Sequence, residues 1–163
     1  MRFLLSFKLK VAGTDEFRGL KATSTSYRFH GILRLDGSVL TIEWGGVAQV
    51  QEFGATTIRD NRLPLPDDSV EIPVELLYRA ALAGGWWLPR LRLRAGAPGV
   101  LSMVPSEELG AVEFWYARAD RDLAITMVAA INKAIADSPS ALDEASEFPV
   151  HAPVPTPPGT SDA

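Results

Sequence analysis

The sequence predicts a mainly β protein of about seven antiparallel strands that is followed by one C-terminal α-helix. Apolar and polar residues alternate in several segments, beginning with "MRFLLSFKLKV" at the start of the chain. This period of two is typical of strands with one buried face. Two glycine-containing turns, Asp36-Gly37 and Gly84-Gly85, lie between alternating segments and predict hairpins. Helical spacing of apolar residues is strongest between Asp120 and Asp137.

The N-terminal segment 2–11 is predicted to be a strand rather than a signal peptide. Its apolar residues occupy alternate positions: Phe3, Leu5, Phe7, Leu9 and Val11. Lys8 and Lys10 interrupt the apolar stretch, and no small-residue cleavage site follows it. The polar segment 14–26 shows no period and is expected to be a loop. The strand 2–11 is therefore expected to be an extra strand at an edge of the sheet.

The segment 27–44 is predicted to be a hairpin, because Asp-Gly suits the positive φ that a type I′ turn needs at both central positions. Counting outward from Asp36-Gly37 gives these pairs: Leu35 with Ser38, Leu33 with Leu40, Gly31 with Ile42, Phe29 with Trp44, and on the other face His30 with Glu43. A slip of one residue would exchange the two faces. A further strand is expected near 47–53, followed by a loop over 59–68.

A second hairpin is predicted to turn at Gly84-Gly85. A helix over 73–84 is the alternative, since proline near the start and glycine at the end suit a helix. The hairpin is favoured because it pairs apolar residues on one face: Leu82 with Trp87, Ala80 with Pro89, Tyr78 with Leu91, and Leu76 with Leu93. On the other face, Arg79 lies opposite Arg90.

The C-terminal third completes the predicted fold. Strands are expected over "VLSMV" (100–104) and "AVEFWYAR" (111–118), and a helix over 120–137 with Asp120 as its cap. The helix has one apolar stripe: Ala124, Met127, Val128, Ile131 and Ile135. The proline-rich tail 138–163 is expected to be disordered, because it cannot bury enough apolar surface to offset its ordering entropy.

Composition excludes several function classes. The 163 residues fit one domain, and a net charge of −4 argues against a general nucleic-acid binder. The lack of cysteine excludes disulfides, thiolate nucleophiles and cysteine zinc sites. His30 is expected to be structural, beside Glu43, and His151 lies in the tail, so a metal site or a serine-histidine pair has little to draw on. No catalytic residue, metal site or cofactor is predicted. The uncharged runs are shorter than the ~20 residues of a membrane helix, and a cytoplasmic location is expected.

The order of the elements resembles the pleckstrin-homology-like (PH or GRAM-like) barrel of bacterial type over residues 27–137. Three segments carry the resemblance: "YRFHGILRLDGSVLTIEW" as the first hairpin, "IPVELLYRAALAGGWWLPRLRLRA" as the middle meander, and "VEFWYARADRDLAITMVAAINKAI" as the last strand and helix. It implies one domain over 1–137, with a barrel over 27–118 that the helix 120–137 closes, and binding without catalysis. The helix lacks the family's tryptophan, and Asp36-Gly37 replaces the long basic loop that binds phosphoinositides, so that ligand is not expected there.

The outer face of the second hairpin is the candidate binding surface. It is expected to present these residues: Arg79, Arg90, Arg92 and Arg94, beside Trp86 and Leu88. Opposed like charges cost stability, and one interpretation is that an acidic partner offsets them, with Trp86 as an aromatic anchor. The favoured interpretation is a solvated face that nearby glutamates neutralise: Glu71, Glu75, Glu107, Glu108 or Glu113.

The predicted function is a non-enzymatic interaction module that engages a protein or an acidic group through this face. One alternative is peripheral binding to anionic membranes through the same Trp and Arg side chains. Another is a small-ligand barrel whose cavity is lined by Trp87, Tyr78 and Trp115, although tryptophans in strands are expected to be core packing. An exposed edge strand would make a homodimer plausible.

Overall fold

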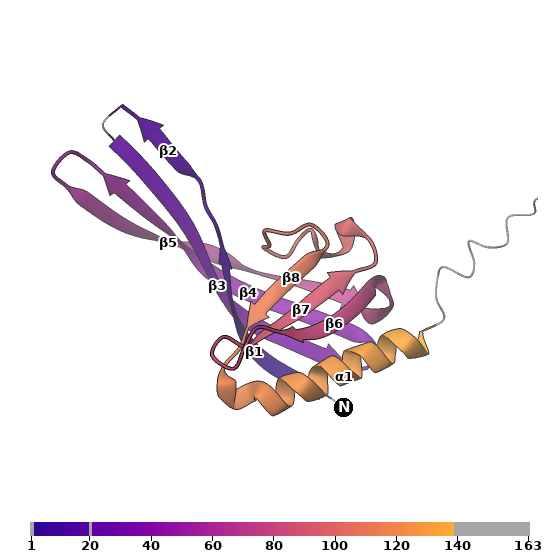
Figure 1. The fold of residues 1–163 in the computed structure, drawn as a ribbon. Helices are drawn as coiled ribbons and strands as arrows, with labels where there is room; N and C mark the ends of the chain where they lie inside the picture. Colours follow the sequence, from indigo (N-terminus) through magenta and orange to yellow (C-terminus); the bar gives the residue numbers. More distant parts are fainter. Residues whose placement is uncertain (1, 20, 139–163) are drawn as a thin grey trace, which may run out of the picture.

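The computed structural model describes residues 2–19 and 21–138. One antiparallel sheet of eight strands dominates it, in the order β5-β4-β3-β1-β8-β7-β6, with β2 paired to β3 (Figure 1). The strands are β1 (Arg2–Val11), β2 (Asp15–Arg18), β3 (Lys21–Asp36), β4 (Val39–Phe53), β5 (Ile58–Pro73), β6 (Leu77–Ala83), β7 (Arg90–Ala95) and β8 (Ala111–Trp115). A single α-helix, α1 (Arg121–Asp137), packs against the sheet. The mainly β fold with one C-terminal helix is confirmed.

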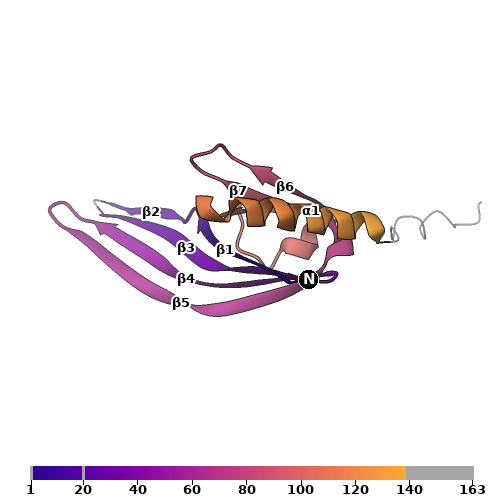
Figure 2. The same ribbon diagram turned by 90° about the horizontal axis from the view of Figure 1, so that it is seen from below.

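The sheet is not closed into a barrel, because its end strands β5 and β6 do not pair with each other. It curls instead, and Figure 2 shows β6 and β7 on one side of α1 and strands β1 to β5 on the other. The barrel predicted over 27–118 is therefore wrong in its closure. Alternation along each strand reports which face is buried, but it carries no information on whether the end strands meet.

Strand β1 lies in the middle of the sheet. It pairs with β3 along its whole length, from Arg2 opposite Asp36 to Val11 opposite Tyr27, and with β8 at Lys8. Its burial alternates residue by residue as predicted, so the predicted strand is confirmed and its predicted place at an edge is wrong. The same alternation would suit a central strand or an edge strand, since only the neighbours differ.

The core lies between the curled sheet and α1. Its fully buried side chains come from nearly every strand and from the helix: Leu5, Leu33, Leu40, Ile42, Ile72, Leu91, Leu93, Phe114, Met127 and Ile131. The predicted helical stripe is confirmed, with Ala124, Met127 and Ile131 buried and Val128 and Ile135 packed against the core. Asp120 stands at the helix start, but its carboxylate makes no capping hydrogen bond. The predicted side-chain cap is therefore wrong.

Both ends of the sheet are protected against the addition of another strand. On β6, the backbone N–H of Ala80 donates to Asn132 Oδ1 at 2.9 Å, and Asn132 Nδ2 donates to the Ala80 carbonyl at 2.8 Å. These two bonds turn α1 into a cover for that edge. On β5, Pro64 and Pro66 remove backbone donors from the other edge. Both devices are ways in which natural sheets avoid edge-to-edge pairing.

The first hairpin turns at Gly37-Ser38, one position later than predicted. Gly37 has φ of +61°, and no described residue other than glycine has a positive φ, so Asp36 cannot take the first place of a type I′ turn. Glycine at the first central position is the pattern of a type II′ turn. Leu33 therefore pairs with Ile42 instead of Leu40, and Ile32 instead of His30 lies opposite Glu43.

The second hairpin is confirmed over the helical alternative, but its register also differs. A loop over 84–89 replaces the predicted two-residue turn, so Leu82 pairs with Leu91 and Ala80 with Leu93. A bulge at Tyr78 places Arg79 opposite Arg94 instead of Arg90. The predictions that Leu76, Tyr78 and Trp87 point inward are wrong, since all three side chains are exposed. Residues 74–76 form a short 3-10 helix, η1 (Val74–Leu76), before β6.

Two predicted loops and one predicted strand have a different structure from the one expected. The loop over 14–26 contains β2 and the start of β3, and the loop over 59–68 is part of β5. The strand over 100–104 is instead a 3-10 helix, η2 (Pro98–Leu101), followed by a turn. The strand over 111–118 ends at Trp115, before a third 3-10 helix, η3 (Arg118–Asp120). The tail prediction lies outside the described residues, except at Ser138.

The ends of β3, β4 and β5 extend beyond the core together with β2 (Figure 1). We call this projection the arm; it comprises β2 and residues 21–28, 46–53 and 58–65. The strands of the arm are paired throughout, from Phe53 opposite Ala22 on one side to Phe53 opposite Ile58 on the other. In Figures 1 and 2 it stands clear of α1 and of β6 to β8.

Candidate functional site

The predicted binding residues are divided between the strands and the loop of the second hairpin. Arg79 is on β6, and Arg90, Arg92 and Arg94 alternate along β7 with Leu91 and Leu93, which are fully buried. The arginines therefore share the outer face, as predicted. Trp86 and Leu88 are exposed in the loop 84–89 and do not lie on a strand of that face.

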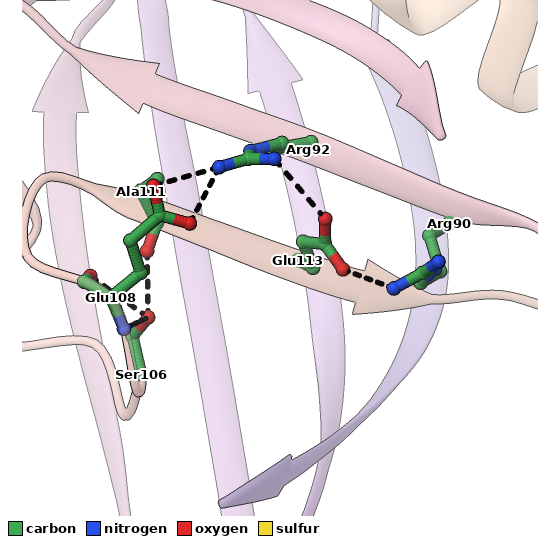
Figure 3. Close-up of polar contacts among 6 residues, drawn as sticks. All are labelled: Arg90, Arg92, Ser106, Glu108, Ala111 and Glu113. Atoms are coloured by element: carbon green, nitrogen blue, oxygen red, sulfur yellow. Dashed lines mark hydrogen bonds and ion pairs between the residues drawn. The ribbon is translucent and has the colours of Figure 1, made fainter. Parts of the chain in front are cut away.

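Arg90 and Arg92 form an ion-pair network with glutamates of β8 and of the preceding turn (Figure 3). Arg90 Nη1 lies 2.5 Å from Glu113 Oε2, and Arg92 Nη1 lies 3.6 Å from Glu113 Oε1. Arg92 Nη2 donates to both carboxylate oxygens of Glu108, at 2.7 and 2.5 Å. The register explains the contacts with Glu113, because Arg92 lies directly opposite Glu113 on β8.

The turn that carries Glu108 is itself fixed by Ser106. The Ser106 hydroxyl donates to the Ala111 carbonyl at 2.6 Å, and the Glu108 backbone N–H lies 3.2 Å from the same hydroxyl oxygen. The network therefore neutralises Arg90 and Arg92, two of the four predicted arginines. The carboxylates come from Glu108 and Glu113, which the sequence analysis had named as possible partners. The network leaves the Nε atoms of Arg90 and Arg92 buried without a partner among the described residues.

Arg79 and Arg94 have no such compensation. They lie opposite each other across β6 and β7 and are exposed. Neither makes an ion pair within 4.0 Å in the part of the chain that the structure describes. Like charges in directly opposed positions destabilise a sheet, so these two arginines are the part of the predicted face that is open to an anionic group.

A second group of arginines contacts the exposed loop. The side chains of Trp86, Trp87 and Leu88 are 63%, 73% and 57% exposed. The Arg118 guanidinium lies 4.4 Å from the ring centre of Trp87, and the Arg121 guanidinium lies 5.5 Å from that of Trp86. We call these five residues the Trp–Arg cluster. Arg118 Nη2 also donates to the Trp87 carbonyl at 3.3 Å, which ties the loop to η3 and the start of α1.

Gly84 sets the path of the loop. Its φ is +78°, a conformation that side-chain-bearing residues rarely adopt, and a Cβ there would meet the Leu88 carbonyl oxygen at 2.1 Å. The chain therefore crosses itself closely at the base of the loop, which directs residues 86–88 away from the sheet. Nearby, the Arg90 guanidinium lies over the Trp115 ring, 5.0 Å from the ring centre.

Tyr116 links the cluster to the core. Burial raises the pKa of the Tyr116 hydroxyl above 10.0, and the positive charge of Arg121 opposes part of that rise. Sequence reasoning missed Arg118 and Arg121, because the contacts that give them a role join residues far apart in the chain. The only local signal was the alternation of basic and acidic residues in "ARADRD" before the helix.

The predicted ligand cavity and the predicted His30–Glu43 pair are not found among the described residues. Trp87 and Tyr78 are exposed, so they cannot line an interior cavity with Trp115. His30 lies opposite Gly45, and the carboxylate of Glu43 pairs with Arg34 at 3.3 Å, so the predicted His30–Glu43 pair is wrong. Within residues 2–19 and 21–138, no group of three or more histidines and carboxylates is placed to hold a metal ion.

Comparison with known proteins adds no assignment. No protein-family model, curated protein or solved structure matches this chain. In the described part of the chain, no helix is both long and apolar enough to cross a membrane.

Proposed function

We propose that this protein is a non-enzymatic binding module, that the Trp–Arg cluster is its contact surface, and that its partner is a protein. The observation that carries the proposal is the exposure of Trp86, Trp87 and Leu88 beside two arginines. Tryptophan and arginine are the side chains most enriched among residues that dominate binding energy at protein interfaces.

The cluster is organised before any partner arrives. Each guanidinium covers part of one tryptophan ring, and Arg118 also holds the loop backbone through the Trp87 carbonyl. A surface that is already ordered loses less conformational entropy on binding than a mobile one. The indole N–H groups and the guanidinium groups are donors, so a complementary surface combines an apolar contact with a carboxylate.

A protein partner is favoured over an anionic bilayer by the charges around the cluster. Asp120 and Asp122 flank Arg121 in sequence, and the chain carries a net charge of −4. Attraction to anionic lipids grows with the number of basic residues near the surface, and here acidic residues are interleaved with the basic ones. The resemblance of the element order to the PH-like family also implies binding without catalysis, and we keep it as part of the proposal.

Selection of peptides from a displayed random library on the immobilised protein tests the proposal. We expect the selected sequences to place an aromatic or aliphatic residue next to Asp or Glu. Replacing Trp87 with alanine should weaken a selected peptide roughly 30-fold, which corresponds to about 2 kcal/mol for a dominant contact. Tyr78→Ala is the matched control, because Tyr78 is an equally exposed aromatic residue on the same hairpin but outside the cluster.

Two outcomes would contradict the proposal. One is selection of peptides whose affinity is unchanged by both Trp86→Ala and Trp87→Ala. The other is salt-sensitive sedimentation with phosphatidylglycerol vesicles that is lost in the same two variants, because it would replace the protein partner with a membrane surface. A peptide that depends on Arg79 and Arg94 alone would move the contact surface to the opposed arginine pair.

A further inference from the structure

The arm is a layer of sheet that stands clear of α1 and of β6 to β8, and most of its residues are exposed or half-buried. Its outer face is the one that continues the solvent side of the core, and even-numbered residues of β3 and odd-numbered residues of β4 point to it, because Leu33, Leu35, Leu40 and Ile42 occupy the opposite, core side. A sheet layer without a covering layer buries little apolar surface of its own. No element among the described residues forms a second layer over the arm.

An apolar row crosses all four strands at the end of the arm on this outer face. The register places its members side by side: Phe17, Ala22, Phe53 and Ile58. Phe17 is 79% exposed and Ile58 is 71% exposed. Apolar side chains scattered singly on a surface are ordinary, but a contiguous group of this kind marks a contact surface.

Three further rows follow the apolar row toward the core, and on β4 and β5 the four rows form a self-complementary pattern. The second row is Ser24, Gln51 and Asp60, the third is Ser26, Gln49 and Arg62, and the fourth is Arg28, Val47 and Pro64. On β5 the sequence of properties is apolar, acidic, basic, apolar. On β4 it is apolar, amide, amide, apolar. These two strands therefore each read as their own complement when their direction is reversed.

We propose that two copies of this chain associate through the outer faces of their arms, packed face to face about a two-fold axis that crosses the strands at Val50 and Asn61. The operation places each strand on its own copy, reversed. Asp60 then faces the partner's Arg62, Gln51 faces the partner's Gln49, and Ile58 faces the partner's Pro64. Phe53 lies on the partner's Val47, so the β4 and β5 members of the exposed apolar row are covered by apolar side chains.

The size of the contact and the blocked edge support this geometry. With strands about 4.8 Å apart and rows about 6.8 Å apart, four rows on β3, β4 and β5, with β2 reaching only the first two, cover roughly 450 Å² on each copy. The total of about 900 Å² fits the small interface of a weak, reversible dimer. Edge-to-edge pairing is disfavoured because Pro64 and Pro66 occupy the free edge of β5, which leaves the face as the surface for self-association.

The test is sedimentation equilibrium of the full chain between about 1 and 200 µM. We expect a reversible dimer in the wild-type protein and a monomer in Ile58→Asp. Leu63→Asp is the matched control: Leu63 lies on the same strand and is 55% exposed, but it points to the other face, so this variant should still dimerise. Circular dichroism melting of each variant shows that the fold is retained.

Charge exchange tests the two-fold arrangement itself. Asp60→Arg and Arg62→Asp each place like charges opposite one another, and each should weaken the dimer roughly tenfold. The double variant restores opposite charges across the axis and should recover dimerisation, although it loses the hydrogen bonds from Gln49 to Asp60. A monomer at every concentration, a dimer indifferent to Ile58→Asp, or a double variant no better than the singles would overturn the proposal. The Trp–Arg cluster takes no part in this contact, so neither proposal depends on the other.

Discussion

Replacing Asn132 with alanine should destabilise the protein far more than its position on the helix suggests. The Asn132 side chain bonds to both backbone groups of Ala80, at 2.9 and 2.8 Å. Ala80 is 1% exposed, so water cannot easily replace the lost partner. The variant removes two hydrogen bonds and leaves a buried N–H and a buried C=O on the β6 edge.

The expected loss follows from those two groups. Each hydrogen bond contributes about 1 kcal/mol net, and each buried group left unsatisfied costs about 1–3 kcal/mol. Partial access of water through the space vacated by the amide lowers the upper limit, and we expect a loss of about 2–4 kcal/mol. For a domain of this size the unfolding midpoint should fall by roughly 10 °C.

Thermal and urea unfolding followed by circular dichroism measure this loss. Asn132→Leu separates packing from hydrogen bonding, because leucine fills a similar volume without either polar atom, and it should be destabilised nearly as much. Lys133→Ala is the neighbouring control, since its ion pair with Asp137 is exposed and contributes little. The reasoning is refuted if Asn132→Leu is as stable as the wild type, or if Asn132→Ala matches Lys133→Ala.

Three further perturbations test the site and its surroundings. Glu113→Gln should lower the free energy of unfolding by about 1–2 kcal/mol in urea titrations, because it removes the charge shared by Arg90 and Arg92, whose side chains are about a third exposed; an unchanged midpoint would show that water already compensates both arginines. Gly84→Ala should lower the free energy of unfolding by about 1–3 kcal/mol, because of the positive φ and the contact with the Leu88 carbonyl. It should also change the tryptophan emission, and an unchanged spectrum would show that the loop still forms. The raised pKa of Tyr116 means that the fold favours the protonated hydroxyl. The contribution of Tyr116 to stability should therefore be constant below pH 10 and be lost as the pH rises above it, and Tyr116→Phe should reduce the fall in stability at alkaline pH in thermal melts.

The pattern of buried faces could be predicted from sequence even where the register could not. Leu33, Leu91 and Leu93 are fully buried as expected, although each has a different cross-strand partner from the one predicted. A displacement by an even number of residues keeps every side chain on its face, so alternation tolerates it. Turn geometry decides the register, and a glycine in the sequence does not show which position of the turn it occupies.

The arm could not be predicted as a whole, because only its β4 segment carries the local signals of a strand. Residues 59–68 contain Pro64, Pro66 and three aspartates, types that are depleted in strands. They form an edge strand because β4 supplies a pairing partner on one side only, and proline is tolerated where no neighbour needs its N–H. Sheet context, which a single sequence does not display, decides such segments.

The candidate site shows the same division between local and distant information. The outward direction of Arg90 and Arg92 follows from alternation, and their neutralising glutamates were among those that the sequence nominated. The contacts of Trp87 with Arg118 and of Trp86 with Arg121 depend on how η3 meets the hairpin loop. No periodicity within either segment encodes that meeting.

The wrong register predicted for the second hairpin and the exposure of the candidate contact surface have the same cause, which is the length of the loop 84–89. A tight turn at Gly84-Gly85 would have kept Trp87 in a strand, paired with Leu82 and buried. The chain instead pairs Leu82 with Leu91 and leaves 84–89 outside the sheet, which exposes Trp87 together with Trp86 and Leu88, the two residues that a compact hairpin would also have left on its outer face. A contiguous exposed apolar group of this kind is typical of an interaction site. The longer loop is therefore the structural feature that most directly motivates the proposed binding through the Trp–Arg cluster.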